Sequence, residues 1–405
     1  MLVGGFGRIF SESFLHMRQR RLIVMGFMGA CPIAGVVWQH LHYIVGLKQL
    51  GHEVYYVEDS ARYPYNPITF ETSEDCSHAL FLLENLAKTF DFQDHWAYCP
   101  RYLKPTESFA IDLTRLRELY READAILNVC GAQELHEDLL GCERLIYIES
   151  DPGVEQIKIA HADHGTRDYL THHRALFTFG ENIGTDFFPV PLHGLQWFPT
   201  RQPIVTDLWK TAGTSEGAVF TTIANWSTRG RKDAMWGGDS YLWSKSDNFL
   251  KFIDAPLAAS EKLELATDIS DPHIAERFQS KGWRLKSPHQ LSSDSEAYRR
   301  YIQGSRGEFT VSKENYVKLN TGWFSDRSAC YLAAGRPVIT QETGFTQHYG
   351  GEKGLFAFST LNEIREAAAA IRADYAMHSK AAFSIAADVF EAKRVLGSLL
   401  DRAGI

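Results

Sequence analysis

A basic cluster follows an apolar segment near the middle of the chain. Ala218–Ile223 (AVFTTI) has the composition of a buried strand, and three cations follow it within ten residues, namely Arg229, Arg231 and Lys232. In parallel α/β sheets, ligands bind beyond the carboxyl ends of the strands, and arginine forks match phosphate oxygens. The cluster therefore predicts a site for phosphate groups, with a solvated basic loop as the alternative. Weaker candidates of the same kind are Lys245, Lys313 and Lys318.

A second candidate anion site precedes a segment of small residues that ends at Gly335. Either Ser325 or Asp326 has a side chain suited to the N-cap of a helix. Free N–H groups at a helix N-terminus attract anions, whereas the helix dipole disfavours a cation such as Arg327 in the first turn. Its position there indicates a bound anion, unless Arg327 simply pairs with Asp326 at the surface. We predict that Ser325–Ser328 contacts phosphate groups.

Two side chains have positions suited to taking a proton from a hydroxyl group. Asp151 follows the apolar segment Arg144–Ile148, so a parallel sheet would place it at a strand end that faces a ligand cleft. His40 lies in Val36–Leu50, whose apolar spacing predicts a helix, and an imidazole titrates near neutral pH. Asp151 is the first candidate for a general base and His40 the second, with a structural helix histidine as the alternative.

Composition narrows the classes of function. A net charge of −8 argues against a nucleic-acid partner, because such proteins usually present a basic surface. The six cysteines include no C-x-x-C pair, so we expect reduced thiols in a cytoplasmic protein. The segment HADH at 161–164 has no third ligand near it, and we predict no metal site. No apolar run approaches the length of a membrane-spanning helix.

The elements that would position these side chains alternate between strands and helices. Arg21–Phe27, Val36–Leu50 and His52–Glu58 form a strand–helix–strand unit. The alternation pauses in Phe187–Pro203, which is rich in Pro and aromatic residues and is typical of a linker, and it resumes at Ala218. The pattern predicts an α/β fold of two Rossmann-like domains whose parallel sheets face an interdomain cleft. We assign a candidate disordered extension to 1–16, the domains to 17–200 and 217–388, and a linker to 201–216.

The segment Ser328–Thr340 runs from the small-residue helix into AAGRPVIT. It resembles the nucleotide-binding helix of B-fold glycosyltransferases, which have two Rossmann-like domains and the pattern helix, x-G-x-P-V-I. The continuation through Thr343-Gly344-Phe345 and the helical tail is similar to the C-terminal domain of spore-maturation-protein-like glycosyltransferases, over roughly residues 217–400. The resemblance implies a nucleotide-sugar donor, an acceptor bound by the N-terminal domain, and a final helix at 389–405 that packs back towards that domain.

The resemblance also implies contacts with the donor sugar and base. Gln341 and Glu342 follow a predicted strand where plant-type inverting members bind the donor sugar, and Thr343 and Gly344 continue that loop. The alternative is that these are solvated strand-end residues. His289 stands where related enzymes hold the donor base, with an ordinary strand-to-helix turn as the alternative.

One departure bears on stereochemistry. Many retaining members of the B-fold class carry a pair of glutamates, where this chain has Trp323 and Cys330. The prediction is therefore a metal-independent glycosyltransferase, slightly favoured as inverting, that uses no cofactor and acts on a small-molecule or lipid-linked acceptor. A sugar-nucleotide epimerase on the same scaffold and a non-catalytic two-lobed binding protein remain as alternatives.

Overall fold

The computed structural model describes residues 18–104, 107–140, 142–211, 217–227 and 233–405. Its first sheet has the strand order β10-β9-β8-β7-β1-β2-β5-β6, and all neighbours are parallel except β5 and β6. The strands are β1 (Arg21–Met25), β2 (Glu53–Ser60), β5 (Trp96–Pro100), β6 (Phe109–Ala110), β7 (Ala125–Val129), β8 (Leu145–Glu149), β9 (Ala175–Thr178) and β10 (Trp197–Pro199).

Helices cover both faces of this sheet because its central strands are apolar on both sides. In β1, Leu22 and Val24 pack in the cluster that includes α1, whereas Ile23 and Met25 pack in the cluster that includes α3. The other elements of this domain are α1 (Ala34–Gln49), β3 (Tyr65–Asn66), β4 (Glu71–Thr72), α2 (Ser77–Thr89), α3 (Leu113–Glu122), α4 (Glu137–Leu140), α5 (Val154–Ala160) and α6 (His164–Thr171).

The second sheet is separate from the first and entirely parallel, in the order β15-β14-β11-β16-β17-β18. Its strands are β11 (Phe220–Ile223), β14 (Leu263–Ala266), β15 (Trp283–Lys286), β16 (Gly307–Thr310), β17 (Val338–Gln341) and β18 (Leu355–Phe358). Around it lie β12 (Ala234–Trp236), β13 (Asp239–Tyr241), α7 (Ser246–Lys251), α8 (Ala255–Ala259), α9 (Pro272–Ser280), α10 (His289–Ser292), α11 (Ser295–Gln303), α12 (Glu314–Lys318), α13 (Asp326–Ala333), α14 (Leu361–Ala373) and α15 (Tyr375–Ile385). The two sheets confirm the predicted α/β fold of two Rossmann-like domains.

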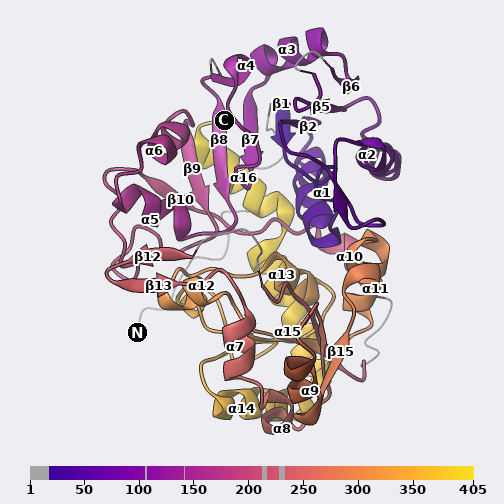
Figure 1. Cartoon of the computed structure of the whole chain (residues 1–405), viewed down its shortest axis with the longest axis vertical. Helices are drawn as coiled ribbons and strands as arrows, with labels where there is room; N and C mark the ends of the chain where they lie inside the picture. Colours follow the sequence, from indigo (N-terminus) through magenta and orange to yellow (C-terminus); the bar gives the residue numbers. More distant parts are fainter. Residues whose placement is uncertain (1–17, 105–106, 141, 212–216, 228–232) are drawn as a thin grey trace, which may run out of the picture.

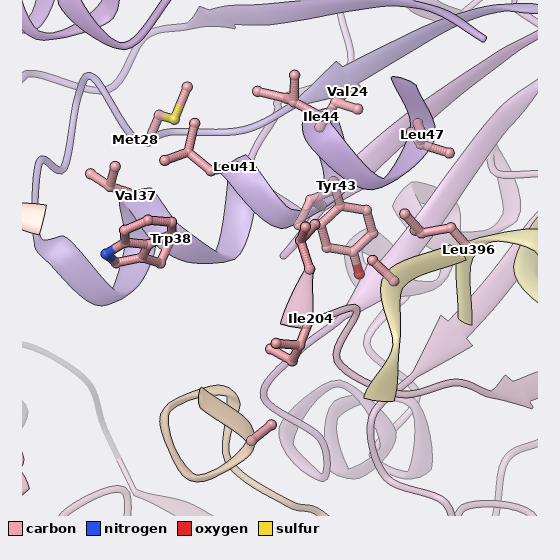
Figure 2. Packing of buried hydrophobic residues seen from close by; sticks show 14 of the residues in the cluster. Val24, Met28, Val37, Trp38, Leu41, Tyr43, Ile44, Leu47, Ile204 and Leu396 are labelled. Carbon is pink, nitrogen blue, oxygen red and sulfur yellow. The ribbon is translucent and has the colours of Figure 1, made fainter. Parts of the chain in front are cut away.

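The chain crosses between the domains twice. Ile204 forms a bridge with Glu391, and α16 (Ala392–Ala403) then lies against α1 of the first domain (Figure 1). Figure 2 shows Leu396 of α16 beside Leu47 and Tyr43 of α1, in a cluster that also contains Ile204. This buried cluster continues into α13 and α15, so the two domains share part of their apolar packing.

One predicted linker segment is a strand. Trp197–Pro199 pairs in parallel with β9 as β10, at the edge of the first sheet. The interpretation of this Pro-rich stretch as a linker was wrong at these residues. Proline has no N–H to donate to a neighbouring strand, but an edge strand has one side without a neighbour, so proline is tolerated there. Within the described residues, no helix is both long and apolar enough to cross a bilayer.

Candidate functional site

A cleft of about 1030 Å³ lies between the domains. Its walls come from the loops that follow β1, β2, β7 and β8 in the first domain, and β11, β14, β15 and β16 in the second. The N-termini of α1 and α13 complete the walls, as shown by Gly35 and Ser325 among the lining residues. The cleft thus lies at the carboxyl ends of both sheets, where α/β folds bind ligands.

Three cationic side chains of the second domain line one wall of the cleft, and we call Lys245, Lys313 and Arg327 the cation cluster. Lys245 is only 8% exposed, and its ammonium has no hydrogen-bond or ion-pair partner among the described residues. Burial, followed by the charge of Arg327, lowers the pKa of Lys245 well below its usual range. An anion bound beside this amine would favour its charged form.

Arg327 is built into the sheet as well as the cleft wall. Its guanidinium donates to Glu308, to the carbonyl of Ile223 at 2.6 Å and to the hydroxyl of Thr310 at 2.9 Å. Arg327 therefore does not form the surface pair with Asp326 that we considered as an alternative. Because Glu308 is fully buried, removal of Arg327 would leave an uncompensated charge in the core.

Asp151 lies in the cleft and reaches across it to the second domain. Its Oδ1 accepts a hydrogen bond from Lys313 Nζ at 2.6 Å and another from the hydroxyl of Tyr316. Lys313 also lies over the Trp243 ring, 4.4 Å from its centroid. These contacts leave Asp151 Oδ1 occupied by two donors of the second domain.

Asp326 is the first residue of α13 and also lines the cleft. Its Oδ1 accepts from Gln39 Nε2 of α1 at 3.3 Å, and burial raises the pKa of Asp326 to about 7. Ser325 is the N-cap and lines the cleft, but its side chain makes no capping hydrogen bond. Ser328 is buried behind the wall, and its hydroxyl has no partner in the described part of the chain.

His40 does not face the cleft. Its Nδ1 lies 2.8 Å from the Val36 carbonyl, its ring packs against Phe27 and Tyr56, and burial lowers its pKa to about 4. A residue in a helix is turned by about 100° from its neighbour, so Gln39 lines the cleft while His40 points to the sheet. The structure thus gives His40 the structural role that we held as the alternative.

The predicted donor-sugar residues are also outside the cleft lining. Gln341 is buried, and its side chain accepts from the Ser312 N–H at 3.1 Å. Glu342 accepts from the N–H groups of Thr343 and Gly344. Gln341 therefore ties the end of β17 to the loop after β16, Glu342, Thr343 and Gly344 form the turn that follows, and none of the four lines the cleft.

His289 lines the cleft at the start of α10, on the side of the second domain. Its Nε2 lies 3.3 Å from Asp268 Oδ2, and its ring meets Phe70 of the first domain edge-on, with 4.5 Å between the ring centroids. The remaining predicted phosphate ligands, Arg229, Arg231 and Lys232, lie outside the described residues.

Two features of the site were missed or ranked too low from the sequence. Lys313 closely follows the predicted strand Gly307–Val311, so the strand-end rule that favoured Asp151 would have favoured it too. Gln39 carries no such signal, because its role depends on the rotation of α1 about its axis. No group of three His, Cys, Asp or Glu side chains suited to a metal ion occurs in the ranges that the structure describes.

Comparisons with known proteins define the fold. No protein-family model and no curated protein matches the sequence. Among solved structures, an α-glucosyltransferase in complex with UDP and a 13-mer DNA containing an HMU base has a TM-score of 0.57 at 13% identity, covering 96% of this chain and 100% of its own. AviGT4, a glycosyltransferase involved in avilamycin A biosynthesis, has a TM-score of 0.51 at 10% identity, covering 95% and 97%. Anabaena Alr3699/HepE, in complex with UDP and glucose, has 0.51 at 9%, covering 95% and 100%. The chain therefore has the B-fold architecture of glycosyltransferases.

Proposed function

We propose that this protein is a glycosyltransferase that moves a sugar from a nucleotide-sugar donor to an acceptor hydroxyl in the interdomain cleft. The observation that carries the proposal is the cation cluster, in which Lys245, Lys313 and Arg327 line one wall beside the N-terminus of α13. Cations and helix N–H groups of this kind bind a diphosphate and stabilise its charge as it leaves.

The chemistry of glycosyl transfer fits this arrangement. The bond between the anomeric carbon and the diphosphate oxygen breaks, its electron pair leaves with the diphosphate, and the acceptor oxygen bonds to the carbon. Fixed positive charge next to the leaving oxygen stabilises the transition state more than the ground state. Two proteins of similar fold have UDP in their complexes, which supports a nucleoside diphosphate as the leaving group here.

The volume of the cleft supports a site that holds two substrates. A volume of about 1030 Å³ lies at the upper end of ordinary small-molecule sites. We propose a small-molecule or lipid-linked acceptor, because the net charge of −8 does not favour a nucleic acid such as the DNA bound by the α-glucosyltransferase of similar fold. We further propose inversion at the anomeric carbon, because Trp323 and Cys330 occupy the positions of the glutamate pair in retaining members.

Titration calorimetry with UDP, GDP and dTDP tests the donor site. Lys245→Met removes a buried amine, which a bound anion would charge, without leaving a buried acceptor unpaired, and we expect it to weaken binding of the preferred diphosphate by about 10–100-fold. Arg327 is less suited to this test because its loss would disturb the buried Glu308. Lys251→Met, at the exposed far end of α7, is the matched control and should bind like the wild type.

The corresponding nucleosides separate phosphate recognition from base recognition, because Lys245→Met should leave their weak binding unchanged. If the diphosphate bound equally well to Lys245→Met and wild type, the proposed site would be wrong. Slow release of free sugar from the donor supports a transferase, an altered donor would indicate an epimerase, and binding without either would indicate a binding protein. We expect transfer to continue in EDTA because the cation cluster supplies the positive charge; loss of activity that Mg²⁺ restores would contradict metal independence.

A further inference from the structure

Asp326 lies between the cation cluster and the first domain. It begins α13, and the next residue, Arg327, turns towards the second sheet, where it binds Glu308. The Asp326 side chain instead faces Gln39 of α1, which belongs to the domain expected to hold the acceptor. Adjacent residues of one helix thus face the two domains, Arg327 the second and Asp326 the first.

A chain of hydrogen bonds fixes the orientation of Gln39. The Ser150 hydroxyl donates to Cys130 Sγ at 3.1 Å, and the Cys130 thiol donates to Gln39 Oε1 at 3.1 Å. Because the amide oxygen is used by the thiol, the amide nitrogen faces Asp326 and can only donate to it. The first domain thereby presents a hydrogen-bond donor that holds the Asp326 carboxylate in the cleft.

We propose that Asp326 is the general base of the transfer reaction and that Gln39 positions its carboxylate. This proposal rests on the proposed function. In the step, the acceptor oxygen attacks the anomeric carbon, and the acceptor proton passes to a carboxylate oxygen of Asp326. The bond to the diphosphate breaks at the same time, and its electron pair leaves with the diphosphate next to the cation cluster. No oxidant, reductant or further reactant is needed.

The surroundings of Asp326 suit a base that works near neutral pH. The pKa of its carboxyl is raised to about 7, chiefly by burial and in smaller part by the nearby charge of Asp151, against the opposing effects of its own backbone N–H, Gln39 and Arg327. Other titratable groups around it are Tyr43, Cys130 and Cys330. Burial raises the pKa of each of these three, so they are neutral at pH 7. Asp151, by comparison, is bound by Lys313 and Tyr316 and is better suited to positioning Lys313.

Asp326→Asn tests the proposal with little change in side-chain size. We expect turnover to fall by about 100-fold or more, because general-base catalysis contributes factors of this size. Calorimetry should show a donor affinity equal to or higher than that of wild type, because the variant removes a negative charge beside the N-terminus of α13. Asp247→Asn is the matched control, because Asp247 is also a first-turn aspartate, in α7, and is exposed outside the cleft. It should keep wild-type turnover. Normal turnover in Asp326→Asn would overturn the proposal.

The pH dependence of turnover distinguishes a general base from a residue that only maintains the structure. Wild-type turnover should rise with pH through a value near 7, as Asp326 loses its proton. This rising limb of the pH profile should be absent in Asp326→Asn. Gln39→Leu removes a hydrogen bond to the charged form, so the limb should shift to higher pH. This second variant decides the matter if Asp326→Asn does not fold, since an unshifted limb would overturn the proposal.

The two proposals fail in different ways. If wild type and Asp326→Asn bind the diphosphate alike and transfer sugar alike, only the assignment of the base is wrong. If the wild-type protein binds no nucleoside diphosphate, the donor site is wrong and the base assignment falls with it.

Discussion

The charge of Lys245 depends on what else occupies the cleft. It is nine-tenths buried, and the groups whose charges act on it are Arg327, Lys313, Glu308 and Asp151, from α13, β16 and the loops that follow β16 and β8. Burial and the neighbouring cations lower its pKa in the free protein. A bound diphosphate would bring negative charge next to the amine and raise the same pKa.

Diphosphate binding should therefore take up protons. Because the anion raises the pKa of Lys245, a proton is bound with the ligand at pH values between the free and bound pKa. The affinity for UDP should then fall as pH rises through the lowered pKa of the free protein. Calorimetry of UDP in buffers of different ionisation enthalpy measures this uptake. Lys245→Arg, whose guanidinium stays charged, should show no Lys245-dependent uptake; equal uptake in both proteins would contradict the prediction.

At the residue scale, position relative to a strand was predictable from the sequence and rotation about a helix was not. Asp151 and Arg327 both line the cleft, and each was selected by a rule about the end of a strand or helix. His40 and Gln39 are adjacent in α1 and differ by about 100° around its axis, and the apolar spacing did not fix that rotation closely enough to show which one faces the cleft. Glu342 was selected by resemblance alone, and its bonds to the following N–H groups depend on a local turn that the sequence pattern does not specify.

At the element scale, the contact between α1 and α16 depends on one glycine. A Cβ atom at Gly46 would lie 2.7 Å from Leu396 Cδ1 and 2.8 Å from Ala392 Cβ. We expect Gly46→Ala to destabilise the protein, because overpacking costs typically 1–3 kcal/mol and exceeds the gain of roughly 1 kcal/mol from replacing a helix glycine. Thermal or urea unfolding measures the difference.

A second glycine of the same helix provides the control. At Gly35 the nearest atom to a new Cβ would be Tyr298 Oη at 3.7 Å, which is an ordinary contact. Gly35→Ala should therefore leave stability unchanged or raise it slightly. Leu396→Ala is itself costly because Leu396 is buried, but the double variant with Gly46→Ala should lose less than the sum of the two single losses. A Gly46→Ala variant as stable as wild type would show that α16 can shift without cost.

Element types were predictable wherever a strand is buried on both faces, because a continuous apolar run such as RLIVM then identifies it. The same rule fails for β10, whose sequence WFP forms a strand only because β9 is available to pair with it. The antiparallel β12–β13 hairpin was not predicted either, and its side chains are mostly half-buried or exposed. Tertiary contacts, rather than local preference, decide such elements.

At the scale of the whole molecule, contacts fix the domains on two sides of the cleft. Away from the cleft lining, the side-chain amide of Asn182 donates to the Asn320 carbonyl at 2.8 Å, and α16 packs against α1. Across the cleft itself, Phe70 meets His289, and Trp323 Nε1 donates to the Ser150 carbonyl at 2.8 Å. Asp151 also joins the two walls through Lys313 and Tyr316, and Gln39 does so through Asp326. We reserve the name cross-cleft contacts for those of Phe70 and Trp323. They involve half-buried or exposed groups, so they can open while the other side remains packed.

Removal of the cross-cleft contacts should shift the free protein towards an open arrangement. We expect Phe70→Ala combined with Trp323→Phe to give a larger radius of gyration in solution scattering, and saturating UDP should reduce it again. If the closed form falls to about one-tenth of the population, the apparent affinity for UDP falls by about tenfold. Leu257→Ala, on the exposed face of α8, removes a comparable apolar side chain elsewhere and should change neither quantity. An unchanged radius in the double variant would show that the other contacts between the domains, which include those of Asp151 and of α16, hold the closed arrangement without the cross-cleft contacts.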